Sequence, residues 1–288
     1  MKSFSVKKIL FSILVALGIV AAHGCSTPNN SNDNDSFFFK PRSINDFIER
    51  QKQKPAEIIE LVCDPGADAI IKSKDYDKLS QLTSLESITF KAIGSAEDAQ
   101  NFFSQLVDLP NLKTVRIEDS RIGSISKLAE IKNLQELHIV LGTYGSPSCR
   151  ISDLDKLGEK GCFTDLKILE LRNMQVETMP DMSELKNLEE LSISGYDLKQ
   201  LDYNCFSWSG LTSLDLSATG ISELDSRIVN DLQKLKKLDL SWSSIKDASF
   251  VLDLPQLEEF TFRMHTKKGT DLEILKKHPN FNDSWMRD

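Results

Sequence analysis

Histidine and cysteine side chains are the groups in this sequence that could serve as bases, nucleophiles or metal ligands, but neither type forms a catalytic pattern. The chain has four histidines and five cysteines. No two cysteines are spaced C-x-x-C, as a zinc ribbon or a thioredoxin-like site requires, and no H-E-x-x-H pair is present. The phosphate loop, the dinucleotide fingerprint and the G-x-S-x-G elbow of hydrolases are also absent from the sequence. We therefore predict that the protein is not an enzyme, and we expect no catalytic residue, metal or cofactor.

The N-terminus combines a positively charged start, an apolar run and a small-residue site. Lys2, Lys7 and Lys8 precede the uncharged residues 9–22, and the sequence Ala-His-Gly-Cys follows at 22–25. The apolar run is too short to cross a bilayer as a helix, so the pattern indicates a secretory signal peptide. We expect residues 1–24 to be that signal and the protein to be exported.

Cys25 has a more specific context. The residues before it resemble a bacterial lipoprotein signal, in which a small residue such as Gly24 precedes a cysteine that is lipidated and becomes the mature N-terminus. The resemblance implies a lipid anchor at Cys25 and a place at the bacterial outer membrane or cell surface. An ordinary cleaved signal peptide with an incidental cysteine is the alternative. Residues 26–36 are almost entirely polar and cannot form a core, which favours a flexible tether over 25–42.

The charge balance limits the class of partner. The chain has a formal net charge of −8 and a sequence pI of about 5.2. Nucleic-acid binding depends on clustered Lys and Arg that neutralise phosphates, so we expect no nucleic-acid partner.

One short phrase recurs along the chain: an apolar residue, two variable residues, an apolar residue, one variable residue and a third apolar residue. Nine copies begin at Ile58, Leu85, Leu112, Leu134, Leu166, Leu188, Leu211, Leu235 and Leu257, at intervals of 22 to 32 residues. Because strand side chains alternate between faces, the second and third apolar positions of each copy point to one side. A single such strand cannot bury that side, so the copies must stack and share a core.

A second set of apolar residues follows ten positions after the start of several copies, at Ile122, Val176, Leu198, Ile221 and Ile245. With this mark the sequence resembles leucine-rich-repeat proteins of the bacterial, internalin-like kind. The resemblance implies an α/β solenoid shaped as a horseshoe, with a parallel concave β-sheet of about nine repeats and short helical or 3-10 convex segments. The family usually has Asn or Cys eight residues after the first position, whereas this chain has Ser120, Thr219 and Ser243 but also Met174 and Tyr196. We therefore expect a less regular solenoid, with an N-terminal cap at 43–57, repeats at 58–266 and a C-terminal cap at 267–288.

The variable positions inside each phrase should face outward on the concave sheet. They predict a largely acidic surface with isolated arginines, in which Glu170, Asp215 and Asp239 share one column and Glu136, Glu190 and Glu259 share the next. For any single one of these residues, a solvated surface position is the simpler interpretation. As a group they favour a protein or peptide partner of basic character. The predicted concave contacts are Arg116, Glu136, His138, Glu170, Arg172, Glu190, Asp215, Asp239, Trp242 and Arg263.

An insertion at Gly142–Arg150 interrupts the fourth repeat and explains much of its 32-residue interval. Loops that interrupt a repeat often bind partners, so Tyr144 and Arg150 join the predicted contacts. Cys149 and Cys162 flank this repeat and could form a disulfide that holds the loop, although two unpaired thiols are the alternative.

These observations predict a non-catalytic protein-interaction module that is exported and anchored to a membrane. Two alternatives share the same surface: a carbohydrate-binding surface protein, and an inhibitor or immunity-type protein that blocks a specific enzyme. The sequence does not choose among the three.

Overall fold

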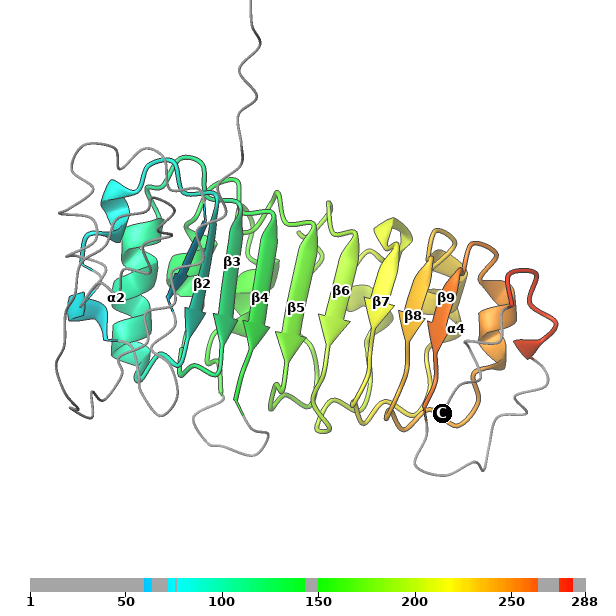
Figure 1. Ribbon diagram of the computed structural model, residues 1–288. Helices are drawn as coiled ribbons and strands as arrows, with labels where there is room; N and C mark the ends of the chain where they lie inside the picture. The colour runs from blue at the N-terminus through cyan, green and yellow to red at the C-terminus, as the bar shows by residue number, and fades with distance from the viewer. Residues whose placement is uncertain (1–59, 64–71, 76, 143–149, 264–274, 282–288) are drawn as a thin grey trace, which may run out of the picture.

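The computed structural model describes residues 60–63, 72–75, 77–142, 150–263 and 275–281, and its main feature is one sheet of nine parallel strands in chain order (Figure 1). Consecutive strands are neighbours throughout, so each repeat contributes one strand and stacks on the one before it. The strands are β1 (Glu60–Cys63), β2 (Ser87–Lys91), β3 (Thr114–Glu118), β4 (Glu136–Val140), β5 (Ile168–Arg172), β6 (Glu190–Ile193), β7 (Ser213–Asp215), β8 (Lys237–Asp239) and β9 (Glu259–Thr261).

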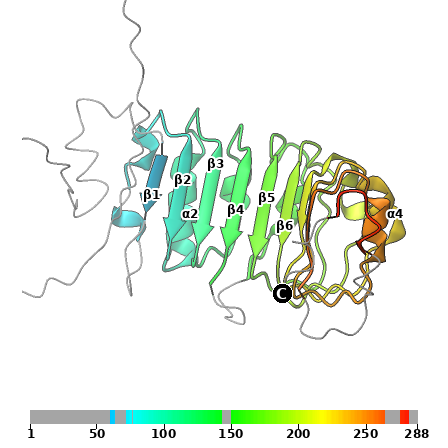
Figure 2. The same ribbon diagram turned by 45° about the vertical axis from the view of Figure 1, so that its right-hand side comes forward.

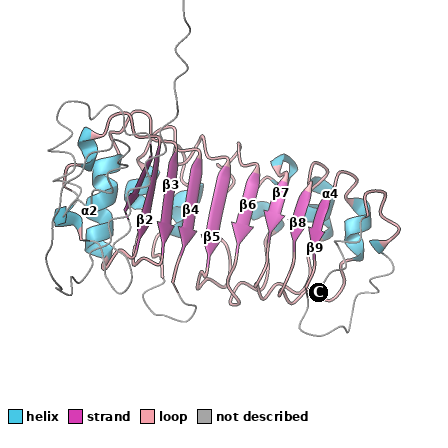
Figure 3. Ribbon diagram, viewed as in Figure 1, coloured by secondary structure: helices cyan, strands magenta, loops and turns pink. Residues whose placement is uncertain are grey.

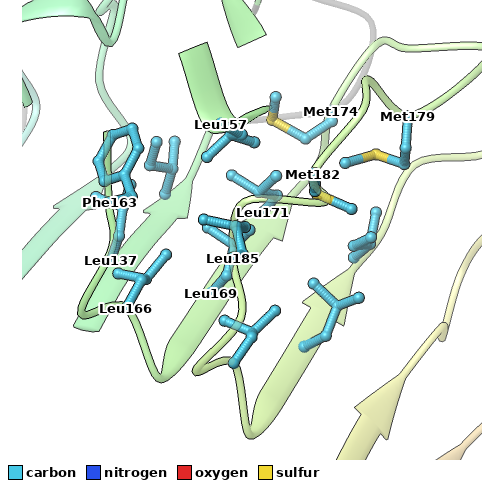
Figure 4. Close-up of a cluster of buried hydrophobic side chains, with 14 of the residues drawn as sticks. Leu137, Leu157, Phe163, Leu166, Leu169, Leu171, Met174, Met179, Met182 and Leu185 are labelled. Atoms are coloured by element: carbon cyan, nitrogen blue, oxygen red, sulfur yellow. The ribbon is translucent and has the colours of Figure 1, made fainter. Parts of the chain in front are cut away.

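Each strand coincides with one copy of the predicted phrase, so the predicted α/β leucine-rich-repeat solenoid is confirmed. Ile58 lies outside the described residues, and the other 26 apolar positions of the nine copies are all buried. Figure 4 shows Leu166, Leu169 and Leu171 of one repeat in this core, with Leu137 of the preceding repeat in the same cluster. The alternation of the strand therefore turns the repeated phrase into one continuous hydrophobic layer.

A tight bend follows most strands and sets the direction of the next segment. The residue seven positions after the phrase begins has a left-handed backbone at Ala92, Asp119, Asn173, Ala218 and Trp242, with φ between 48° and 60°. The bend keeps the backbone amide available to the next repeat: the Asp119 amide donates to the Val140 carbonyl, and the Ala218 amide donates to the Ser241 carbonyl. The hydrogen-bond ladder thus extends beyond the strands themselves.

Hydroxyl side chains replace part of the asparagine ladder that is usual in the repeat family. The Ser120 hydroxyl accepts a hydrogen bond from the Ile93 amide at 2.9 Å, and the Thr219 hydroxyl donates to the Leu216 carbonyl at 2.7 Å. Met174 is instead buried in the core, and the side chain of Tyr196 is 49% exposed. The hydrogen-bond ladder is therefore partial, as the sequence predicted. In the repeat that contains Met174, the Ser194 hydroxyl accepts from the Asn173 amide, a contact that the pattern did not predict.

The segments opposite the open face of the sheet are mostly short helices and 3-10 turns (Figure 3). They are η2 (Ser73–Asp75), η3 (Leu79–Gln81), α2 (Ala96–Leu106), α3 (Ser126–Ala129), η5 (Leu154–Gly158), η6 (Tyr203–Cys205), η7 (Trp208–Gly210), α4 (Ser226–Asp231) and η8 (Ser249–Asp253). The segment at 180–186, which we expected to be helical or 3-10, forms turns only.

Helix α2 is longer than the short segments that the sequence led us to expect. It has 11 residues, begins after Ser95, whose hydroxyl accepts from the Asp98 amide, and lies behind β2 and β3 in Figure 2. Phe102 and Phe103 place their rings 5.0 Å and 6.3 Å from the ring of Phe90 on β2. The 27-residue spacing between the second and third copies provides the additional length for this helix.

The ends of the solenoid are described only in part. The predicted cap at 43–57 and the tether and signal before it lie outside the described residues. At the other end, Leu275 is fully buried, and the His278 ring, 3% exposed, has Nε2 2.8 Å from the Leu254 carbonyl oxygen. Residues 275–281 therefore pack on the last repeats. Within the described part of the chain, no helix has the length and apolar character needed to cross a membrane.

The shared core predicts a sharp contrast between two adjacent positions on β7. Leu214→Asp should lower the free energy of unfolding by ~4 kcal/mol or more, because it removes buried apolar contacts and places a carboxylate among them. Ser213→Asp, one residue earlier on the open face, should change it by less than ~0.5 kcal/mol. Thermal and urea unfolding followed by circular dichroism measure both changes. Equal stability of the two variants would contradict the assignment of faces.

Candidate functional site

The open face of the sheet, formed by the outward side chains of the strands, brings most of the predicted contact residues together. In the strand register, Arg116 lies beside His138, His138 beside Glu170, Glu170 beside Ser192, and Ser192 beside Asp215 and then Asp239. A neighbouring column contains Glu136, Ile168, Glu190, Ser213, Lys237 and Glu259. The predicted columns are therefore adjacent in space, although Lys237 and Ile168 interrupt the acidic one.

Glu170 on β5 is the centre of a charged network on this face. Its Oε2 lies 2.7 Å from Nδ1 of His138 and 3.3 Å from an Nη atom of Arg116. Its Oε1 accepts from Nε of Arg172 at 2.6 Å. The other end of Arg172 donates to Asp215 at 2.8 Å, and the Ser192 hydroxyl donates to the same carboxylate oxygen at 3.0 Å. One carboxylate thus connects side chains from β3, β4 and β5, and Arg172 extends the network to β7.

This network corrects the expectation of isolated arginines on an acidic face. Arg116 and Arg172 are paired with carboxylates, so the centre of the face is close to charge balance. The excess negative charge lies around the centre instead. The sequence pattern placed each residue on the correct face, but it could not show which long side chains reach across two or more strands.

The pKa of Glu170 reports how strongly this network favours the ionised carboxylate. The hydrogen bond from His138 lowers the pKa, burial opposes that effect, and the charge of Arg172 lowers it further, to about 2. Glu170 is therefore a carboxylate at any physiological pH. It fixes the orientation of three neighbouring cationic or hydrogen-bonding side chains.

Among the polar residues within the nine described strands, His138 is the most buried. It is 7% exposed, and its Nδ1 faces Glu170. Its other ring nitrogen, Nε2, is buried and has no hydrogen-bond partner, and Oε2 of Glu136 lies 3.6 Å away. Among the described residues, Nε2 of His138 is the one buried side-chain nitrogen or oxygen atom without a hydrogen-bond partner.

A hollow of about 220 Å³, which we call the open-face hollow, lies over β4 to β7 beside this network. Its lining includes His138, Ile168, Glu170, Arg172, Glu190 and Asp215. A larger hollow of about 880 Å³ lies over the turns that precede β3, β4 and β5, between residues 107–110, 129–134 and 161–165. The larger hollow contains none of the network residues, so the open-face hollow is the better candidate for specific recognition.

The remaining predicted contacts are spread along the molecule. Asp239 accepts from the Ser241 amide at 2.8 Å, Arg263 lies two residues after β9, and the side chain of Trp242 is 39% exposed after β8. Tyr196, which follows β6, is the other exposed large aromatic residue of the described chain, and the sequence argument did not select it as a contact. Tyr196 stands eight residues after the start of its copy, where the family usually has Asn or Cys. This departure was the signal in the sequence that could have identified it.

The insertion and its cysteines lie largely beyond what the structure describes. Tyr144 and Cys149 are outside the described residues, while Arg150 is exposed. Cys162 is partly buried, and burial is the main cause that raises the pKa of its thiol. The bridge between Cys149 and Cys162 and the loop contacts remain predictions. In the part of the chain that is described, no group of three or more His, Cys, Asp or Glu side chains could hold a metal ion.

Because the Glu170 carboxylate connects several side chains of the network, we expect it to make a pH-dependent contribution to stability. At neutral pH, Glu170→Gln should lower the free energy of unfolding by ~1–2 kcal/mol, a value reduced from the full pKa shift because the pair is partly solvated. A lowered pKa in the folded state stabilises above about pH 4.5 and loses this effect as the pH falls toward the folded pKa of about 2. The difference between wild type and variant should therefore shrink over that range in urea titrations.

Glu189→Gln provides the matched control for this experiment. Its carboxylate is 55% exposed and lies 3.7 Å from Lys167, so its removal should change stability by less than ~0.5 kcal/mol. A constant difference between Glu170→Gln and wild type from pH 7 to pH 2.5 would show that the network does not stabilise the carboxylate.

Comparisons with known proteins agree with this architecture. No protein-family model matches the sequence. Toll-like receptor 3 of Boselaphus tragocamelus is 32% identical over 116 residues, which span 37% of this chain but only 13% of the receptor. A solved leucine-rich-repeat protein of Leptospira interrogans, LIC12759, matches with a TM-score of 0.54 and 20% identity over 78% of this chain and 54% of that one. An internalin of Listeria monocytogenes, inlF, matches with a TM-score of 0.47 and 15% identity, covering 77% of this chain and 72% of that one. Together with the repeats and the nine-stranded sheet, the match to the Leptospira protein shows that the chain has the leucine-rich-repeat fold.

Proposed function

We propose that this protein is a non-catalytic interaction module that binds a protein or peptide partner across the open face of its sheet. The observation that carries the proposal is the Glu170 network, which holds charged or hydrogen-bonding side chains from four strands in fixed positions on that face. Charges that are oriented before binding lose little conformational entropy on association and select a complementary surface. A regular solenoid also offers a long surface for such contacts.

Two exposed aromatic residues that follow strands of the sheet support the same function. Tyr196 and Trp242 follow β6 and β8, and aromatic side chains are frequent energetic anchors of protein interfaces. Trp242 has a left-handed backbone at φ 60°, an unfavourable conformation for a bulky residue. The same bend follows other strands, so the repeat sets this backbone, and its effect at Trp242 is to place a large, partly exposed side chain at the strand end.

The location of the protein remains part of the proposal. We propose export by the signal at 1–24 and lipid anchoring through Cys25, with residues 25–42 as the tether. This arrangement would present the solenoid at the outer membrane or cell surface, where an interaction module could meet partners. The support is the sequence pattern around Gly24 and Cys25. Metabolic labelling with a radioactive fatty acid tests it, since Cys25→Ala should abolish incorporation.

A carbohydrate ligand is the second candidate, and the two exposed aromatic side chains are the observation that favours it. Sugar binding on aromatic faces persists at high salt, whereas binding through exposed charges is weakened by screening. The salt dependence of binding therefore separates a glycan from a charged protein partner. Identification of a captured partner as an enzyme whose activity falls on binding would select the inhibitor function.

We predict that affinity capture with the protein produced from its full sequence retains a specific partner at low salt and loses it at high salt. Glu190→Lys should weaken this capture at least ~10-fold, because a reversed charge on the open face repels a basic partner. Glu223→Lys makes the same charge change between β7 and α4, away from the strands, and should leave capture unchanged. Equal capture by both variants would place the partner on another face.

A further inference from the structure

The contact between Nδ1 of His138 and Glu170 leaves Nε2, the other ring nitrogen, without a hydrogen-bond partner. Glu170 stays ionised and accepts a hydrogen bond from Nδ1 at 2.7 Å, so Nδ1 carries the ring proton when the imidazole is neutral. Nε2 then carries a lone pair and can only accept. It is buried without a hydrogen-bond partner, which is an unfavourable state for a nitrogen acceptor. A ligand with a hydrogen-bond donor directed at Nε2 would remove this unfavourable state.

The charges around Nε2 favour a positively charged donor. Glu136, Glu170, Glu190 and Asp215 are four carboxylates in or beside the open-face hollow, whereas Arg116 and Arg172 are the two guanidinium groups there. Both guanidinium groups are bonded to Glu170 or Asp215. The surplus of negative charge therefore belongs to the other two carboxylates, Glu136 and Glu190.

These two carboxylates lie on either side of an apolar residue. In the strand register, Glu136 is beside Ile168, and Ile168 is beside Glu190. Adjacent strands are separated by about 4.8 Å, so the two carboxylate-bearing residues are about 10 Å apart across Ile168. Lys and Arg side chains have this dual character, with an aliphatic stem that packs on apolar surface and a cationic end that seeks carboxylates.

We propose that a basic side chain of the protein partner docks in the open-face hollow, with its stem on Ile168 and its cationic end between Glu136 and Glu190, donating a hydrogen bond to Nε2 of His138. This inference rests on the proposed function and gives it a chemical specificity. The Glu136 side chain is 40% exposed and lies 3.6 Å from Nε2. Its rotation toward solvent admits the donor while the carboxylate remains close to the bound cation.

Nuclear magnetic resonance with ¹⁵N-labelled histidine tests the contact directly on the protein produced from its full sequence. The probe is N-acetyl-arginine amide, and N-acetyl-citrulline amide, in which a neutral urea replaces the guanidinium, is the matched control. We expect the Nε2 signal of His138 to shift progressively toward that of a hydrogen-bonded acceptor with arginine amide up to about 50 mM, a range suited to millimolar affinities. The citrulline compound should bind at least ~5-fold more weakly, since it has no charge for Glu136 and Glu190. The lysine analogue shows whether an ammonium group serves as well as a guanidinium.

Variants separate recognition from folding. His138→Asn retains a donor toward Glu170 but lacks the Nε2 acceptor, and it should weaken arginine-amide binding ~3-fold or more. Glu190→Gln should weaken binding of the probe ~3-fold or more, whereas Glu223→Gln should not change it. Amide spectra of each variant verify that the solenoid remains folded.

An unchanged Nε2 signal in the folded wild-type protein would overturn this inference, as would equal binding of the arginine and citrulline compounds. If the signal is unchanged but affinity capture still depends on Glu190, the open face binds a partner by other contacts and only this inference fails. If the probe binds as expected but capture does not depend on the open face, the proposed function fails instead.

Discussion

The structure depends on one constraint, which is that no strand of this protein can bury its apolar side without the strand before it and the strand after it. Each repeat contributes two or three inward residues, such as Leu214 and Leu216, and these are buried only because Leu191 and Leu238 lie on the neighbouring strands. The nine-stranded sheet is the result of satisfying this need repeatedly. The bend after the strands follows from the same requirement, because the chain must turn sharply to return to the next strand in register.

The repeat that forms the core also arranges the polar side chains of the open face. The spacing that aligns buried leucines also aligns outward residues in columns, so that Arg116, His138 and Glu170 come from three repeats but lie side by side. The hydrogen bond from His138 and the charge of Arg172 lower the pKa of Glu170 to about 2, and Arg172 also donates to Asp215. A surface that is ordered in this way is suited to recognition, because its polar groups are oriented before a partner arrives.

Much of the fold could be predicted because the repeat is a strong signal. The nine phrases located every strand of the described chain, and the alternation of side chains placed the predicted contact residues of the strands on the outward face. Other features were not predictable from the pattern. Helix α2 exceeded the expected length, since a wider interval permits a helix but does not require one. The charge pairs were missed because contacts over 54 residues, as between Arg116 and Glu170, depend on the stacking of three strands.

The sequence by itself determined the solenoid, its direction of stacking and the identity of the residues on each face, because these follow from a local period of apolar residues. The tertiary structure alone decided which outward residues bond to one another, how deeply His138 is buried and which carboxylates retain excess charge. The physical reason is that periodicity specifies the direction of a side chain, whereas burial and pairing depend on the distance between side chains from different repeats. The candidate site is therefore a property of the stacked sheet and of no single repeat.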